Sequence, residues 1–283
     1  MHLAIARTLR LLNASTVVAL SGGMRLHVAF LLAGIAIRIP VYIAFTLIVY
    51  ATYTLDRTLD CKEDMMNRDD LAGADRNLGI IACGLTFLAG AVLLVSDGII
   101  FAPFFPFIIG YLYSHGIRFG PLNLRFKAGA GIKNAVIGIT WGGTIALIMS
   151  RWCSEIITIG VIFLFFALKV FITSCVNDFK DVRGDVAAGI HTLPARLGEG
   201  LTKKVLIAIL LGSYLVMLYA LLHALVQNEW VLLGFGFLIT LVFLLVYTSS
   251  FEKKRELVYR KMREFVISWE SVVGLVLRAC VSA

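Results

Sequence analysis

The sequence predicts an all-α, polytopic membrane protein whose helices surround a central chamber capped by cytoplasmic loops. Its 283 residues are 59% apolar and only 16% charged, and the mean hydropathy is +0.89. A soluble domain carries roughly 45–50% apolar and about 25% charged residues. One globule of this size cannot bury such an excess of apolar surface, which argues against a soluble enzyme. The same composition argues against a disordered chain and a disulfide scaffold.

Apolar stretches long enough to span a membrane recur along the chain. A helix needs about 20 apolar residues to cross the hydrocarbon core of a bilayer. We expect nine transmembrane helices, at residues 11–33, 36–55, 78–96, 98–115, 132–150, 155–176, 203–225, 230–250 and 265–282. Asp97-Gly98 marks a tight turn between the third and fourth helices. We interpret residues 1–283 as one integral-membrane domain.

The basic residues predict the orientation of the chain in the membrane. Most of the 26 Lys and Arg residues fall near the N-terminus and in the segments 56–77, 116–133, 177–204 and 251–264. Cytoplasmic loops carry an excess of Lys and Arg, so we expect the N-terminus and these loops to be cytoplasmic. The net charge of +8 then reflects topology rather than nucleic-acid binding. No organelle-targeting segment is visible, which favours a prokaryotic cell membrane.

The acidic residues gather where orientation alone does not require them. Eleven of the 18 Asp and Glu residues lie in the segments 56–77 and 177–204. If the second predicted helix continues past residue 55 into the first segment, one of its faces carries four carboxylates and an amide. These side chains then lie within a stripe about 100° wide. Its members are Asp56, Asp60, Glu63, Asp64 and Asn67. In the second segment, Asp178, Asp181 and Asp185 share a helical face that Asn177 borders.

These two stripes predict a metal site. Carboxylates one helical turn apart repel each other by a few tenths of a kcal/mol, and a bound divalent cation removes that penalty. Mg²⁺ typically takes one or two carboxylates and completes its coordination with water and phosphate oxygens. Two stripes that face each other are therefore suited to a metal-bridged diphosphate. The alternative is that these residues are only solvated loop charges.

The second acidic segment resembles a motif of the UbiA superfamily of intramembrane prenyltransferases. From Asp178 to Gly198 it reads D-x-x-D-x-x-G-D-x-x-x-G-x-x-T-L-P-x-x-L-G, which is close to the family pattern. The family places its two Asp-rich motifs after the second and sixth of nine helices. The first motif usually reads N-D-x-x-D-x-x-x-D, and this chain instead has Thr52, Tyr53, Asp56 and Asp60 at the four defined positions.

The loop after the fourth predicted helix resembles the family in part. The family has a Tyr and a Lys there, followed by Gly-Asn. Lys127 and Asn134 keep a similar separation, and Lys133 stands in place of the Gly. Tyr113 and Arg118 lie in the neighbourhood of the family Tyr.

The resemblance implies an activity and a set of residues. The activity is Mg²⁺-dependent transfer of an isoprenoid chain from a polyprenyl diphosphate to a hydrophobic acceptor in the lipid bilayer, with release of pyrophosphate. The acceptor is an aromatic quinone precursor or a lipid headgroup. The implied metal ligands are Asp56, Asp60, Asp64, Asp178, Asp181 and Asp185. The implied diphosphate-binding residues are Lys127, Lys180, Arg183, Arg118, Asn134 and Asn177. Catalysis is assigned to Asp56, Asp60, Asp178, Asp181 and Lys127.

Two other functions are compatible with the sequence. The first is a terpene cyclase with the same fold, in which a double bond of the substrate captures the carbocation. The second is a divalent-cation transporter, although the carboxylates of a transporter are expected at the bilayer midplane rather than at helix ends.

Two charged residues inside predicted spans leave their roles open: Lys169 either snorkels or points into the chamber, and Glu270 faces either lipid or a cavity. Trp141 is expected to pack or to form a chamber wall.

Overall fold

The computed structural model describes residues 2–58, 76–115, 117–119, 122–124, 131–187, 192–247 and 256–282. The helices are α1 (His2–Leu32), α2 (Ile39–Thr58), α4 (Arg76–Ser96), α5 (Phe104–His115), α6 (Ile132–Met149), α7 (Ile156–Ala187), α8 (Leu193–Leu222), α9 (Trp230–Val246), α11 (Glu256–Glu264) and α12 (Glu270–Ser282). A π-helical turn, η2 (Phe265–Trp269), joins α11 to α12 without a break. Two short strands, β1 (Ile117–Phe119) and β2 (Leu122–Leu124), pair antiparallel.

The helical bundle has the apolar exterior of a membrane protein. Among the described residues, six helices are long and apolar enough to cross a membrane: α1, α2, α4, α6, α7 and α8. A further apolar helix, α9, is shorter. Large apolar side chains cover the outside of α4, where Leu85 is 65% exposed and Leu88 is 61% exposed. A soluble protein rarely leaves so much contiguous apolar surface uncovered, and lipid accounts for it.

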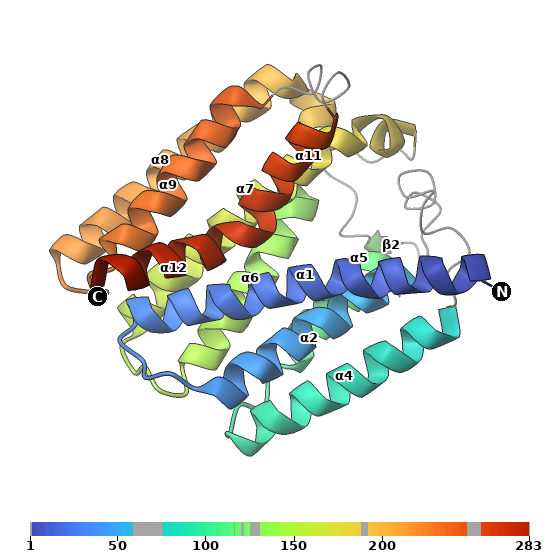
Figure 1. Ribbon diagram of the computed structural model, residues 1–283, viewed down its shortest axis with the longest axis horizontal. Helices are drawn as coiled ribbons and strands as arrows, with labels where there is room; N and C mark the ends of the chain where they lie inside the picture. Colours follow the sequence, from blue (N-terminus) through green and yellow to red (C-terminus); the bar gives the residue numbers. More distant parts are fainter. Residues whose placement is uncertain are drawn as a thin grey trace.

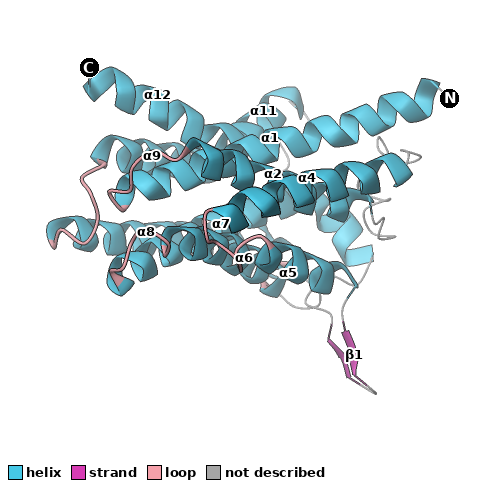
Figure 2. Cartoon of the chain, turned by 90° about the horizontal axis from the view of Figure 1, so that it is seen from below, coloured by secondary structure: helices cyan, strands magenta, loops and turns pink. Residues whose placement is uncertain are grey.

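The helices form a closed arrangement that brings the two acidic segments to one end. Most successive helices run in alternate directions, α4 and α5 both pack against α2, and α12 returns to contact α1 (Figure 1). The C-terminal ends of α2 and α7 and the N-terminal ends of α6 and α8 all lie at the end where the chain begins (Figure 1). The β1–β2 hairpin stands apart from the helices at this same end (Figure 2).

Each of the nine predicted spans corresponds to a helix, but several predicted ends were wrong. The predicted helix 155–176 extends to Ala187, and the predicted helix 203–225 begins at Leu193. The predicted helix 11–33 runs over 2–32, so it begins earlier than expected. The predicted helix 98–115 begins later, at Phe104, and the predicted helix 265–282 is part of a longer helical stretch that begins at Glu256. Hydropathy marks only the part of a helix that lies in lipid, whereas helical hydrogen bonds continue into polar sequence beyond the bilayer.

Proline and glycine account for two of these boundaries. Pro103 immediately precedes α5, and Pro194 occupies the first turn of α8, positions where the missing backbone N–H costs nothing. Within α8, Gly198 has a φ of +71° and kinks the helix. Residues with a β-carbon rarely adopt this conformation, so glycine permits the kink. The predicted Asp97-Gly98 turn is confirmed, with Gly98 at a φ of +80°.

Small residues let α6 and α7 approach until their backbones touch. A β-carbon on Gly138 would lie 2.4 Å from the backbone oxygen of Ala167. One turn later, a β-carbon on Gly142 would lie 2.8 Å from the Ala167 backbone nitrogen. Glycines four residues apart are a common means of close helix packing in membranes. This contact sets the distance between the start of α6 and the polar end of α7.

The closeness of this contact is testable by adding a single methyl group. Gly138→Ala places a methyl group against backbone that cannot move aside, and such overpacking costs about 1–3 kcal/mol. We expect a lower thermal unfolding midpoint for the detergent-purified variant. Gly160→Ala is the matched control, because a β-carbon at Gly160 of α7 meets nothing within 4 Å. Equal midpoints for the two variants would contradict the backbone contact.

Candidate active site

Asp178 of α7 is a buried carboxylate held by two residues from α6. Its side chain is only 2% exposed. The Nζ of Lys133 donates to Oδ1 at 2.9 Å, and the Nδ2 of Asn134 donates to Oδ2 at 2.7 Å. Asn134 also donates to the Oγ of Ser174, one turn earlier on α7, at 3.0 Å. A buried charge is tolerated when it is paired and hydrogen-bonded, and here each carboxylate oxygen has a donor.

Local sequence explains how this polar cluster forms. Gly131, with a φ of +76°, precedes α6, so Lys133 and Asn134 fall in its first turn. Asn134 lies four residues before Gly138 and therefore on the same helical face, which the glycines press against α7. Ser174 and Asp178 are likewise four residues apart and face α6 together. The two helices thus meet through small residues in the membrane and through polar residues at its edge.

The oxygen atoms of this cluster suit a hard divalent cation. The Oδ1 atom of Asn134 is buried and has no hydrogen-bond partner among the residues that the structure describes. Each oxygen of Asp178 can accept more than one interaction. Carboxylate and amide oxygens are ligands that Mg²⁺ and Ca²⁺ accept. The observed residues therefore fit the predicted metal.

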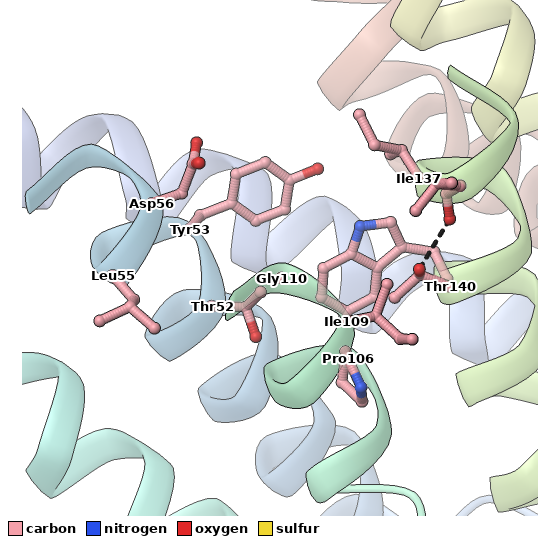
Figure 3. A pocket seen from close by; sticks show the side chains of 11 residues that line it. Thr52, Tyr53, Leu55, Asp56, Pro106, Ile109, Gly110, Ile137 and Thr140 are labelled. Atoms are coloured by element: carbon pink, nitrogen blue, oxygen red, sulfur yellow. Dashed lines mark hydrogen bonds between the residues drawn. The ribbon is translucent and has the colours of Figure 1, made fainter. Parts of the chain in front are cut away.

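Asp56 borders an apolar cavity at the same end of the bundle. The cavity has a volume of about 90 Å³ and lies between α2, α5 and α6. It is lined by Thr52, Tyr53, Leu55, Asp56, Pro106, Ile109, Gly110, Val136, Ile137, Thr140 and Trp141. Figure 3 shows Tyr53 and Asp56, about one helical turn apart on α2, across from the α5 residues Pro106, Ile109 and Gly110. The cavity thus joins one carboxylate to a largely apolar wall.

Aromatic rings form part of that wall. The ring of Tyr53 stacks on Trp141, with centroids 5.7 Å apart and planes only 6° from parallel. The guanidinium carbon of Arg57 lies 5.7 Å from the Tyr53 ring centroid, and its Nη1 donates to the Oγ of Ser15 at 2.6 Å. Trp141 is therefore a chamber wall, in agreement with one of its two expected roles.

The structure describes only some of the predicted site residues. It brings Asn134 to Asp178, leaves Asn177 half-buried and Lys180 exposed on α7, and places Asp56 at the cavity. Asp181, Arg183 and Asp185 belong to α7 and Arg118 to β1, but their side chains lie outside the described part of the structure. Asp60, Asp64 and Lys127 lie outside the described residues. Among the side chains that are described, no group of three or more His, Cys, Asp or Glu residues can hold a metal ion.

Lys133 and Ser174 are site residues that the sequence analysis did not assign. The family resemblance noted Lys133 only because it stands where the family has a glycine, although it adjoins Asn134, which was assigned to the site. Ser174 lies one helical turn before Asp178, which is a signal for a shared face but not for a hydrogen bond. Their roles depend on the approach of α6 to α7, which the sequence pattern does not reveal.

Comparison with known families identifies the class of protein. The sequence matches the UbiA prenyltransferase family over residues 43–266, well over half of the chain. The chain therefore belongs to the UbiA prenyltransferase family, and with its apolar helices it is an integral membrane protein. A comparison with curated proteins gave no significant match.

Solved structures share this fold at low sequence identity. A digeranylgeranylglyceryl phosphate synthase matches with a TM-score of 0.61 and 15% identity, and the alignment covers 99% of each chain. A UbiA homologue from Archaeoglobus fulgidus, bound to DMAPP and Mg²⁺, matches with a TM-score of 0.61 and 16% identity over 96% of this chain and 99% of that one. An apo UbiA homologue from Aeropyrum pernix K1 matches with a TM-score of 0.64 and 14% identity, and the alignment covers 93% of this chain and 97% of that one. These similarities establish the fold and confirm the predicted helical membrane bundle.

The pairing of Asp178 is testable through stability. Lys133→Met leaves the buried carboxylate with Asn134 as its remaining α6 donor, and an unsatisfied buried group costs on the order of 1–3 kcal/mol. We expect a lower thermal midpoint, and we expect a second change, Asp178→Asn, to restore most of it by removing the charge. A Lys133→Met variant as stable as the parent protein would contradict the pairing.

Proposed function

We propose that the protein transfers an isoprenoid chain from a polyprenyl diphosphate to a hydrophobic acceptor within the membrane, releasing pyrophosphate in a Mg²⁺-dependent reaction. The observation that best supports this is the position of the Asp178 cluster beside the cavity. Asn134 of α6 holds Asp178, and Val136 and Ile137, within the next turn of α6, line the cavity. A polar site for a diphosphate thus adjoins an apolar site for a hydrocarbon.

Mg²⁺ bound at the acidic segments would neutralise the diphosphate and stabilise the departing pyrophosphate. The ligands that we propose are Asp178, Asp181 and Asp185 from α7, with Asp56, Asp60 and Asp64 from the first segment. The orphaned oxygen of Asn134 supports a cation at this place. The Archaeoglobus fulgidus homologue is bound to DMAPP and Mg²⁺, which supports the use of Mg²⁺ with a prenyl diphosphate.

Cationic and amide side chains complete the proposed diphosphate site. We assign the positive charge of this site to Lys127, Lys180, Arg183 and Arg118, and its amide groups to Asn177 and Asn134. Charge-assisted hydrogen bonds from such groups to phosphate oxygens are roughly twice as strong as neutral ones. Lys133 serves as a positioning residue, because it fixes the Asp178 carboxylate.

The reaction follows from this arrangement. The bond between the allylic carbon and the diphosphate oxygen breaks, and its electron pair leaves with pyrophosphate. The stacked rings of Tyr53 and Trp141 line the space where the allylic cation forms, and ring faces attract positive charge. The apolar wall excludes water that would capture the cation. A nucleophilic atom of the acceptor then bonds to the allylic carbon, and its proton passes to a carboxylate or to pyrophosphate.

Pyrophosphate release tests the proposed function. Purified protein is mixed with geranyl, farnesyl or geranylgeranyl diphosphate and a membrane extract, with and without Mg²⁺. We expect release that requires Mg²⁺ and that falls about 10²–10³-fold in Asp178→Asn, the range for loss of one electrostatic contact to a transition state. Asp97→Asn, in the turn after α4 at the other end of the bundle, is the matched control.

The pattern of pyrophosphate release separates the alternatives. Release that needs the extract supports a transferase, whereas equal release without it indicates a cyclase or a hydrolase. No release from any donor, or full release by Asp178→Asn, would refute the proposal.

We also propose that the protein resides in a prokaryotic cell membrane with its N-terminus and acidic segments in the cytoplasm. The Lys- and Arg-rich segments all join helices at the end where α1 begins (Figure 1). Alkaline phosphatase, which is active only outside the cytoplasm, is fused after residue 282 in a bacterial host to test this orientation. We expect activity from this fusion and none from a fusion before α1. The reverse result would invert the topology.

A further inference from the structure

The apolar cavity beside Asp56 extends over little more than one helical turn. On α2 its lining residues run from Asp56 back to Thr52, and on α6 they run from Val136 to Trp141. At a rise of about 1.5 Å per residue, these stretches correspond to about 6–8 Å of helix. Each isoprene unit adds four carbon–carbon bonds of about 1.5 Å to an extended chain, so about two units fill this depth.

Trp141 closes the deep end of the cavity, which is the end farthest from Asp56 along the helices. The Tyr53 ring stacks on the indole ring, and the Phe45 ring meets it edge-to-face with centroids 6.1 Å apart. One turn deeper, Ile48 of α2 and Ile145 of α6 are at most 1% exposed and do not line the cavity. The interior beyond Trp141 is therefore filled by packed side chains.

Helix α5 closes the side of the cavity that faces lipid. Three residues on one face of α5 line the cavity: Pro106, Ile109 and Gly110. Ile108, on the opposite face, is 54% exposed. A β-carbon on Gly110 would lie 3.3 Å from Cγ2 of Thr52, and a β-carbon on Gly143 of α6 would lie 3.0 Å from the Phe105 ring. Helix α5 thus contacts both of the helices that flank the cavity.

A second cavity, between α7, α8 and α9, is unsuited to a hydrocarbon chain. It shares no lining residue with the first cavity and is lined by an ammonium group, four hydroxyl groups and two apolar side chains: Lys169, Thr173, Ser213, Tyr214, Thr240, Ile172 and Leu210. Lys169 forms an ion pair with Glu270 of α12, and the two side chains are only 14% and 5% exposed. The structure thus decides both open roles: Lys169 does not snorkel, and Glu270 points inward. Buried charge next to hydrocarbon is costly.

The ring against Trp141 occupies a position where this chain departs from the family motif. The motif usually has an Asp at the position of Tyr53, one turn before Asp56. A carboxylate there would extend the polar metal site toward Trp141. The Tyr53 ring instead extends the apolar wall and covers one face of the indole ring. The departure therefore removes a candidate metal ligand and adds an aromatic surface to the cavity.

We propose that Trp141, with the ring of Tyr53 stacked on it, determines the length of the donor, and that the donor is a short prenyl diphosphate such as dimethylallyl or geranyl diphosphate. This inference rests on the proposed prenyl transfer and names the class of its donor. A third isoprene unit has to displace the Trp141 ring or the packed side chains beyond it. A single added methylene in a hydrophobic pocket already changes kcat/KM by about 10–200-fold.

The ratio of two donors on one enzyme tests this inference. Mg²⁺-dependent pyrophosphate release in the presence of membrane extract is measured with dimethylallyl, geranyl, farnesyl and geranylgeranyl diphosphate. We expect kcat/KM of the parent protein to be at least about tenfold higher for geranyl than for farnesyl diphosphate. We expect Trp141→Ala to bring this ratio close to one, because loss of the indole ring makes room for a further isoprene unit. A general loss of activity in the variant cancels in the ratio.

Control variants separate donor selection from a loss of packing. Trp152→Ala makes the same change at a tryptophan that packs on Phe30 and lines neither cavity, and it should keep the ratio of the parent protein. Tyr53→Phe keeps the ring and should keep the ratio as well. If Trp141→Ala does not fold, Trp141→Leu, which leaves part of the space filled, replaces it.

Two results would overturn the inference. The first is a parent protein that uses farnesyl diphosphate as well as geranyl diphosphate, which would indicate a chain that leaves the bundle sideways. The second is a folded Trp141 variant that keeps the ratio of the parent protein. No release from any of the four donors by the parent protein would instead refute the proposed function.

Discussion

The backbone contact between α6 and α7 is the constraint on which the candidate site depends. Asp178 can be buried as a charged group only because Lys133 and Asn134 reach it across this contact. They reach it because Gly138 and Gly142 carry no side chain that would separate the helices. A wider spacing would leave a carboxylate without donors at the edge of the apolar core, which is far more costly than the ordering of one lysine.

Two of the buried acids, Asp178 and Glu270, are paired in similar ways, but their carboxylate oxygens differ in how many hydrogen-bond partners they have. Lys133 holds Asp178 and Lys169 holds Glu270, in each case across two helices. Both oxygens of Asp178 have donors, whereas one oxygen of Glu270 has no partner among the described residues. The α6–α7 contact thus satisfies its buried acid more fully than the contact between α7 and α12 does.

Sequence reasoning recovered the helices and part of the site, and it failed where tertiary contacts decide. The run from Asp178 to Gly198 carried the family assignment, and the comparison confirmed it. The helical phase expected for Asp178, Asp181 and Asp185 is confirmed, because α7 continues to Ala187. Lys133 was not assigned, since a lysine at a helix start is most often solvated. The directions of Lys169 and Glu270 stayed open because hydropathy does not report which face of a buried helix meets which neighbour.

The sequence by itself determined the class of this protein, the places of its apolar helices and the residue types of its acidic motifs. These follow from local properties, namely the apolar length needed to cross a bilayer and the helical repeat. Only the tertiary structure decided that Asn134 and Lys133 hold Asp178, that Tyr53 stacks on Trp141, and that Lys169 pairs with Glu270. Each of these contacts joins helices that are far apart in the chain, and which faces meet depends on side-chain volumes summed over the whole bundle.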